Sequence, residues 1–313
     1  MDLVDAHHHL WIPERREPDL GYGWLRDVGA PKPFGDPTPI QRDYLWAEYA
    51  AESDAHRLVG SVHVQTDGAL PDPVAETAWV QSVFDRTGLP HAIVGLADLA
   101  APDLDATLAA HARHRDFRGV RQIVSRLDDR PELSFAPRHL LRDAAWRAGY
   151  ARLSAHALSF DLQCYPEQMG EVADFLAEHP ATPVVLDHAG SPHDGSEAGR
   201  RRWREGVDRL AALEHVAVKL SGFGMFDAAW TADSVRALVD HLLDAFGPER
   251  VLWGSNFPVE RLARTFDEVV AGVRGACDSL DEGACRGVFV DNAARVYRLE
   301  PPPADAGSAS ATR

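Results

Sequence analysis

The chain has 313 residues, which fits two ordinary domains or one barrel-sized domain, and 45% of them are apolar. Its 48 acidic residues outnumber its 32 basic ones, and the net charge of −16 argues against nucleic acid or an anionic membrane as a partner. Three cysteines without Cys-x-x-Cys spacing exclude a disulfide framework and a cysteine-type zinc site. A cytoplasmic location is expected, because the first strand begins within a few residues of Met1 and no apolar run reaches membrane-spanning length.

The first predicted strand, Leu3–His9, ends in three consecutive histidines. Side chains alternate between the two faces of a strand, so His7 and His9 share one face and His8 points the other way. Two imidazoles on one face can reach the same divalent cation, but a catalytic metal usually has three protein ligands. The cluster is therefore either half of a metal site or a polar strand end.

A long segment from about residue 12 to residue 43 follows, rich in proline and glycine and without a sustained period. Loops of this length inside compact domains are usually lids or binding loops. Its aromatic residues Tyr22, Trp24 and Phe34 either pack over a pocket or anchor the loop to the body of the protein.

From there strand-like apolar runs alternate with segments of helical spacing. The further predicted strands are Leu58–Gln65, Ala92–Leu99, Phe117–Val124, Ser159–Tyr165, Thr182–Ala189, Val216–Gly222 and Arg250–Asn256. Eight strand and helix units in one chain predict a single closed (β/α)8 TIM barrel over residues 1–300, with a final helix at Ala284–Val296. The Pro-, Ala- and Ser-rich segment 301–313 is expected to be a disordered tail.

Polar side chains occur at the carboxyl ends of nearly all the predicted strands, where barrels of this kind build their active sites. They are His7, His9, His63, Gln65, Asp98, Arg121, Gln122, Gln163, His188, Lys219, Ser221 and Asn256. His188 follows a rigid apolar run and is the best third metal ligand, although a single strand-end histidine is often only structural. Asp187 precedes it and is expected on the opposite face of the strand, away from the chemistry.

Four motifs resemble one known family. They are Asp-Ala-His-His-His-Leu-Trp at 5–11, Val-Leu-Asp-His-Ala-Gly-Ser-Pro at 185–192, Val-Lys-Leu-Ser-Gly at 218–222 and Leu-Trp-Gly-Ser-Asn-Phe-Pro at 252–258. Together they resemble the amidohydrolase superfamily, and within it the sugar lactonases and dicarboxylate-lactone hydrolases of amidohydrolase family 2. The resemblance implies a (β/α)8 hydrolase with one divalent metal, most often zinc, with manganese as an alternative. Some lactonases of this branch work without a metal.

The resemblance also implies roles for individual residues. His7 and His9 match the metal pair of the first strand, and His188 matches a histidine that binds the metal or orients the attacking water. Arg121 matches an arginine that holds a substrate carboxylate or carbonyl, although a structural ion pair with Asp98 is an alternative. From their positions on the second strand, His63 and Gln65 are further candidates for substrate binding. Lys219 is equally well interpreted as a structural charge.

Asn256 is the main departure from the family pattern, which has an aspartate that takes the proton of the nucleophilic water. A neutral amide cannot be a general base. Three explanations remain open: another group such as His188 or Asp98 is the base, the metal alone ionises the water, or hydrolysis has been lost.

The sequence thus predicts a hydrolase of a small molecule, with a lactonase as the favoured type and His188 and Asn256 as catalytic residues. The alternatives are a metal-dependent decarboxylase of a carboxylated ring and a non-catalytic ligand-binding barrel. Nucleic acid and membranes are not expected as partners, and a homo-oligomer is compatible with the fold.

Overall fold

The computed structural model describes residues 1–14 and 19–300, so the predicted tail at 301–313 lies outside the described residues. Eight parallel strands pair in sequence order, each with the next along the chain. They are β1 (Asp2–His8), β2 (Arg57–Val64), β3 (His91–Leu96), β4 (Phe117–Arg121), β5 (Ser159–Leu162), β6 (Val184–Leu186), β7 (Val216–Leu220) and β8 (Val251–Trp253). Every strand predicted from the sequence is present, with ends that differ by a few residues.

The two outer strands of this sheet meet just beyond the end of β8. The backbone N–H of Asn256 donates to the carbonyl of His7, and the N–H of His9 donates to the carbonyl of Phe257, both at 2.7 Å. The sheet is therefore a nearly closed barrel, and the prediction of a (β/α)8 fold is confirmed.

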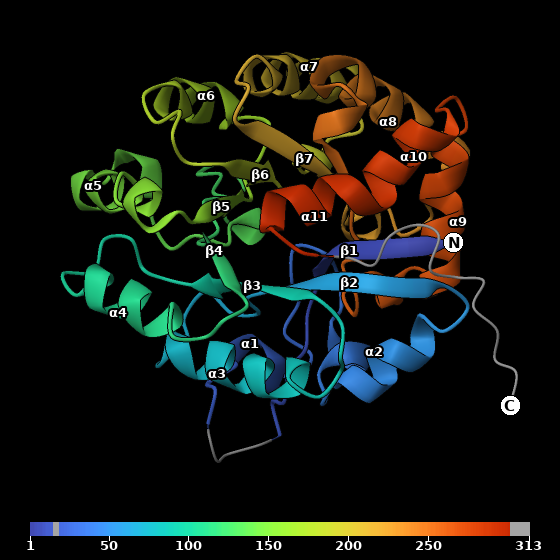
Figure 1. Ribbon diagram of the computed structural model, residues 1–313. Helices are drawn as coiled ribbons and strands as arrows, with labels where there is room; N and C mark the ends of the chain where they lie inside the picture. The colour runs from blue at the N-terminus through green and yellow to red at the C-terminus, as the bar shows by residue number, and fades with distance from the viewer. Residues whose placement is uncertain (15–18, 301–313) are drawn as a thin grey trace, which may run out of the picture.

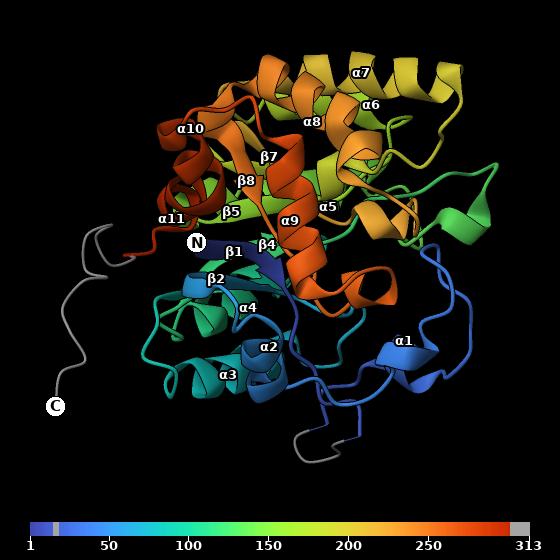
Figure 2. The same ribbon diagram turned by 90° about the vertical axis from the view of Figure 1, so that its right-hand side faces the viewer.

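Helices surround the strands on the outside (Figures 1 and 2). They are α1 (Gly23–Arg26), α2 (Trp46–Glu52), α3 (Pro73–Phe84), α4 (Leu104–His111), α5 (Ala144–Tyr150), α6 (Met169–Ala177), α7 (Glu197–Ala211), α8 (Ala232–Phe246), α9 (Phe266–Ala276), α10 (Glu282–Arg286) and α11 (Asn292–Tyr297). In α8 the buried residues Val235, Val239 and Leu242 recur at helical spacing and face the barrel. Within residues 1–14 and 19–300 we find no helix with the length and apolar character needed to cross a membrane.

The predicted final helix is divided into three parts. A π-helical turn, Gly287–Asp291, separates α10 from α11 and packs against β1 and β8. In Figure 2, α1 and its loop lie on the side of the molecule opposite the N-terminus. Because β1 begins at the N-terminus, this places the loop near the carboxyl ends of the strands, where a site is expected.

The Asp5 carboxylate ties β1 to the segment after β8. Its Oδ1 accepts from the backbone N–H groups of Ser255 and His7, at 2.8 and 3.0 Å, and its Oδ2 accepts from the hydroxyls of Ser255 and Tyr49, at 2.6 and 2.8 Å. All of these groups are buried. Asp5 therefore fixes the position of His7 relative to the end of β8.

Replacing Asp5 by alanine is expected to lower the free energy of unfolding by about 3 kcal/mol, because two buried backbone donors lose their acceptor. Asp5→Asn is expected to cost only about 1 kcal/mol, since an amide oxygen can still accept from both donors while the hydroxyls can reverse their direction. Urea unfolding of the two variants measures the difference. An equal loss of unfolding free energy in the two variants would contradict this role of the hydrogen bonds to Asp5.

Candidate active site

A cavity of about 780 Å³ opens among the loops that follow the strands. Seven of the strand-end residues predicted from the sequence line it, namely His9, Asp98, Arg121, Gln122, Gln163, His188 and Asn256. His7, His63 and Gln65 are fully buried and are not part of its wall. A cavity of this size with a few polar groups converging on it suits a small-molecule ligand.

The long loop between β1 and α2 forms part of the cavity wall. Trp24 and Phe34 line the cavity, with ring centres 6.0 Å apart. Tyr22 is fully buried, and its hydroxyl donates to the Glu76 carboxylate at 3.0 Å. The two interpretations of these aromatic residues therefore both hold, because Trp24 and Phe34 face the pocket while Tyr22 anchors the loop.

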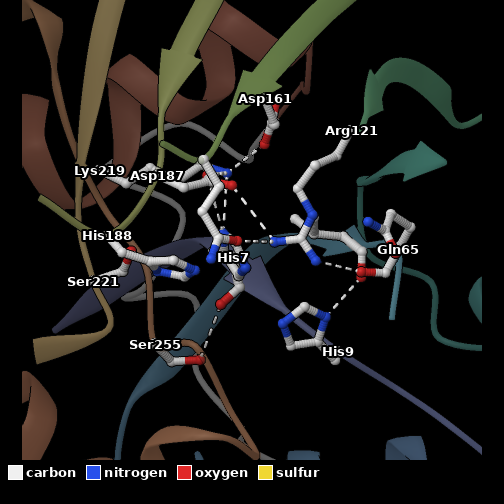
Figure 3. Close-up of polar contacts among 12 residues, drawn as sticks. His7, His9, Gln65, Arg121, Asp161, Asp187, His188, Lys219, Ser221 and Ser255 are labelled. Carbon is white, nitrogen blue, oxygen red and sulfur yellow. Dashed lines mark hydrogen bonds and ion pairs between the residues drawn. The ribbon is translucent and has the colours of Figure 1, made fainter. Parts of the chain in front are cut away.

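The side chains of the first strand alternate as predicted. His8 stacks on Tyr49 of α2, with ring centres 4.4 Å apart, and bonds to the Ser61 hydroxyl. The rings of His7 and His9 lie together on the other face, with centres 5.0 Å apart. Figure 3 shows His7 at the centre of the polar contacts in the site.

His7 Nδ1 lies between two groups of opposite charge. Asp187 Oδ1 is 3.3 Å away and Lys219 Nζ is 3.2 Å away. Burial and the charge of Lys219 hold the pKa of His7 well below its usual range, so the ring is neutral. When the Nδ1–H form donates to Asp187, the lone pair of Nε2 is free, and this buried atom has no hydrogen-bond partner among the residues that the structure describes.

His9 and His188 are held in a similar way. His9 Nδ1 donates to the backbone carbonyl of Val64 at 2.7 Å, which leaves the Nε2 lone pair free. His188 Nδ1 shares a hydrogen bond of 3.1 Å with the Ser221 hydroxyl. Burial lowers the pKa of both rings, to about 3 for His188. All three histidines are consequently neutral near pH 7 and have one ring nitrogen directed by a neighbour.

The prediction that Asp187 points away from the site is wrong. Strand β6 ends at Leu186, and His188 and Ala189 adopt left-handed backbone angles, with φ of 54° and 51°, so the alternation of side chains stops before His188. Asp187 and His188 therefore lie on the same side. Among the described residues, His7, Asp187 and His188 have ligand atoms within 4.8 Å of one another.

A buried ion cluster lies beneath these residues. Lys219 Nζ contacts Asp161 Oδ2 at 2.5 Å and Asp187 Oδ1 at 3.0 Å, and the Tyr297 hydroxyl also donates to Asp161, at 2.8 Å. Asp161, Asp187 and Lys219 are fully buried. Burial raises the pKa of Asp187, but Lys219, His7 and His188 together outweigh burial and hold that pKa well below its usual range. Sequence reasoning missed Asp161, although a single carboxylate inside an apolar strand was a usable signal.

Arg121 extends from β4 toward the same cluster. Its guanidinium lies 3.5 Å from Asp187 Oδ2 and donates to the backbone carbonyl of Gln65 at 2.6 Å. Asp98, the alternative partner suggested by the sequence, instead accepts from Gln122. Arg121 is thus held by the protein and also lines the cavity, where its remaining donors can meet a substrate oxygen.

His63 and Gln65 lie behind the cavity wall. His63 Nδ1 accepts from the backbone N–H of Leu10 at 3.2 Å. Neither polar atom of the Gln65 side chain has a hydrogen-bond partner among the described residues. The structure therefore places the two predicted substrate-binding residues of β2 close to the site but not at the surface of the cavity.

The family model described as Amidohydrolase matches residues 4–299. The chain belongs to this amidohydrolase family. The resemblance seen in the four motifs is thereby confirmed, and the protein is a hydrolase of this family.

Named relatives of this amidohydrolase cover almost the whole chain. L-fucono-1,5-lactonase of Burkholderia multivorans is 34% identical, over 97% of this chain and 98% of the relative. The protein y4mH of Sinorhizobium fredii is also 34% identical, over 95% and 98% of the two chains. A crystal structure of a Burkholderia multivorans amidohydrolase with bound zinc is 32% identical, covers 96% of this chain and 100% of the other, and superimposes with a TM-score of 0.78.

The residues of this amidohydrolase suit a divalent metal. Within the described part of the chain the buried Nε2 of His7 has no hydrogen-bond partner, the Nε2 of His9 has a free lone pair, and neutral imidazoles are the form that binds metals. Asp187 offers a carboxylate to the same position as His7 and His188. His9 is not part of that close group, so the predicted set His7, His9 and His188 is only partly brought together.

Proposed function

We propose that this amidohydrolase is a lactonase that opens a small cyclic ester by addition of water, with sugar 1,5-lactones as the first substrates to test. The observation that carries the proposal is the meeting of neutral His9 and His188, cationic Arg121 and the Asn256 amide at one cavity. The L-fucono-1,5-lactonase relative supports the choice of substrate. Cytoplasmic location and oligomeric state stay predictions.

We propose that His7, His9 and His188 hold one divalent metal, with Asp187 as a neighbouring carboxylate. Zinc is favoured over manganese because the related Burkholderia structure contains bound zinc. Held by these residues, zinc would supply a Lewis acid for the lactone carbonyl and would lower the pKa of a bound water to about 7.

The chain's own residues do the remaining work of the reaction. Arg121 donates to the carbonyl oxygen of the lactone and stabilises the negative charge that develops on it. With a pKa near 3, His188 is a weak base, so in this proposal its neutral ring orients the attacking water or binds the metal. Gln65 holds Arg121 through its backbone carbonyl, and His63 fixes the chain after β1, so both support the substrate from behind the wall.

Elemental analysis of the purified protein and of the His7→Ala/His9→Ala variant tests the metal proposal. We expect about one equivalent of zinc or manganese in the wild type, none in the variant, and loss of activity on chelation that added metal reverses. His8→Gln is the matched control, because His8 lies on the same strand but faces α2, and it should keep its metal. A full metal complement in the double variant would contradict the assignment.

A further inference from the structure

Glu260 is a buried carboxylate directly behind Asn256. It begins the short helical turn Glu260–Leu262, and its backbone N–H donates to the carbonyl of Asn256 at 3.0 Å. Oε1 accepts from the backbone N–H of Gly224 at 2.7 Å and from the indole N–H of Trp230 at 2.9 Å. The side chain is 1% exposed, so these two donors fix the plane of the carboxylate without help from solvent.

The second oxygen of this carboxylate, Oε2, and the amide nitrogen Nδ2 of Asn256 are both buried, and neither has a hydrogen-bond partner among the described residues. The Asn256 side chain interacts favourably with the Glu260 carboxylate and lowers its pKa, so the two groups lie next to each other. An ionised carboxylate only accepts hydrogen bonds, so it must face the NH₂ group of the amide, which turns Asn256 Oδ1 toward the cavity that Asn256 lines.

We propose that Glu260 is a positioning residue that acts through Asn256. It holds the amide with Oδ1 directed at the attacking water, and it supplies next to the site the negative charge that Asn256 lacks. The inference rests on the proposed lactonase function. It also gives a reason for the departure of Asn256 from the family pattern. This part of the site still has a carboxylate, but the carboxylate belongs to Glu260, which lies behind Asn256.

The protonation state of Glu260 depends on the groups around it. Burial raises the pKa of Glu260 to about 7, against the hydrogen bonds from Gly224 and Trp230, the nearby Asn256 amide and the charge of Arg264. Below that pH a protonated Glu260 can donate to Asn256 Oδ1 and release the NH₂ group into the cavity. Activity should therefore fall as the pH drops through about 7.

The first test is Glu260→Gln, which keeps the shape and removes the charge. A glutamine at position 260 can present its NH₂ group to Asn256, and the Asn256 amide then turns its Oδ1 away from the cavity. We therefore expect kcat to fall about 10- to 100-fold, with KM changed less than about threefold. The decline of kcat below pH 7 should also disappear. Glu76→Gln is the matched control, because Glu76 is equally buried and burial raises its pKa to about 7, yet it bonds to Tyr22. This variant should keep that decline.

Further variants test the same pair of residues by changing Asn256. Asn256→Asp places two carboxylates together, so kcat should fall and the apparent pKa of the decline should rise. Asn256→Asp/Glu260→Gln restores one carboxylate and one amide, and its kcat should exceed that of Glu260→Gln about tenfold. In the background Asn256→Ala, Glu260→Gln should have no further effect on kcat.

A Glu260→Gln protein with the wild-type kcat and pH profile would overturn the proposal, as would an additive effect in the Asn256→Ala background. If Glu260→Gln does not fold, an Asn256→Asp protein with an unchanged pH profile would overturn it equally. The metal content of each variant shows whether a loss of activity comes from a damaged metal site. All these variants should bind as much metal as the wild type. A wild type without activity on lactones would instead contradict the proposed function.

Discussion

Replacing His188 by asparagine is expected to lower kcat by about 10²- to 10⁴-fold, because the variant lacks the ring nitrogen that faces the cavity. Asparagine is the suitable replacement, since residue 188 has a φ of 54° and asparagine tolerates this left-handed conformation better than alanine does. The effect should fall mainly on kcat if His188 acts on the water or the metal and not on substrate binding.

Initial-rate kinetics and a thermal melt measure this prediction together. Ala157→Gly is a matched control for changes at a left-handed position, because Ala157 has a φ of 52° and lies after a short turn before β5. It should keep the wild-type kcat. A His188→Asn protein with a kcat within a few-fold of the wild type would show that the chemistry occurs elsewhere.

Lys219→Met should produce the largest loss of stability, about 3–5 kcal/mol in the free energy of unfolding at pH 8. The substitution leaves the carboxylates of Asp161 and Asp187 buried without the cation that lies 2.5 and 3.0 Å from them. Lys32→Met is a matched control, since Lys32 is the other lysine of the chain and is partly exposed at the cavity wall. It should change stability by less than about 0.5 kcal/mol.

The pH dependence of this loss has a definite sign. In the wild type, Lys219 is the strongest of the groups that together hold the pKa of Asp187 below its unfolded value against burial, so this contribution is present above that unfolded value and is lost as the pH falls through the folded value. In Lys219→Met the two carboxylates become easier to protonate, so the difference from wild type should shrink between pH 8 and pH 5. Chemical denaturation at both pH values measures it. A difference that is constant with pH would contradict the electrostatic explanation.

The barrel could be predicted because its signal is local. Each strand is an apolar run, each helix has an apolar face, and their alternation leaves few other arrangements. The partition of the last helix by the turn Gly287–Asp291 could not be predicted, because that turn is shaped by packing against β1 and β8.

The site could be predicted only as far as regular strand geometry extends. His7, His9 and Arg121 follow from alternation along β1 and from the end of β4. The orientation of Asp187 could not be predicted in this way, because alternation ends with β6 and the chain adopts left-handed backbone angles at His188. Contacts between residues far apart in sequence could not be predicted either: Lys219 contacts Asp161, 58 positions away, and His7, 212 positions away.

The most direct test of the account is a pH-stat measurement of acid release from a 1,5-lactone by the metal-loaded wild-type protein, with ¹⁸O-labelled water. The account predicts release of one acid per ring opened, with a kcat/KM of about 10⁴ M⁻¹s⁻¹ or more on at least one sugar lactone and one labelled oxygen in the product carboxylate. No acceleration over spontaneous hydrolysis across the series of lactones, or release of carbon dioxide from a carboxylated ring instead, would contradict it.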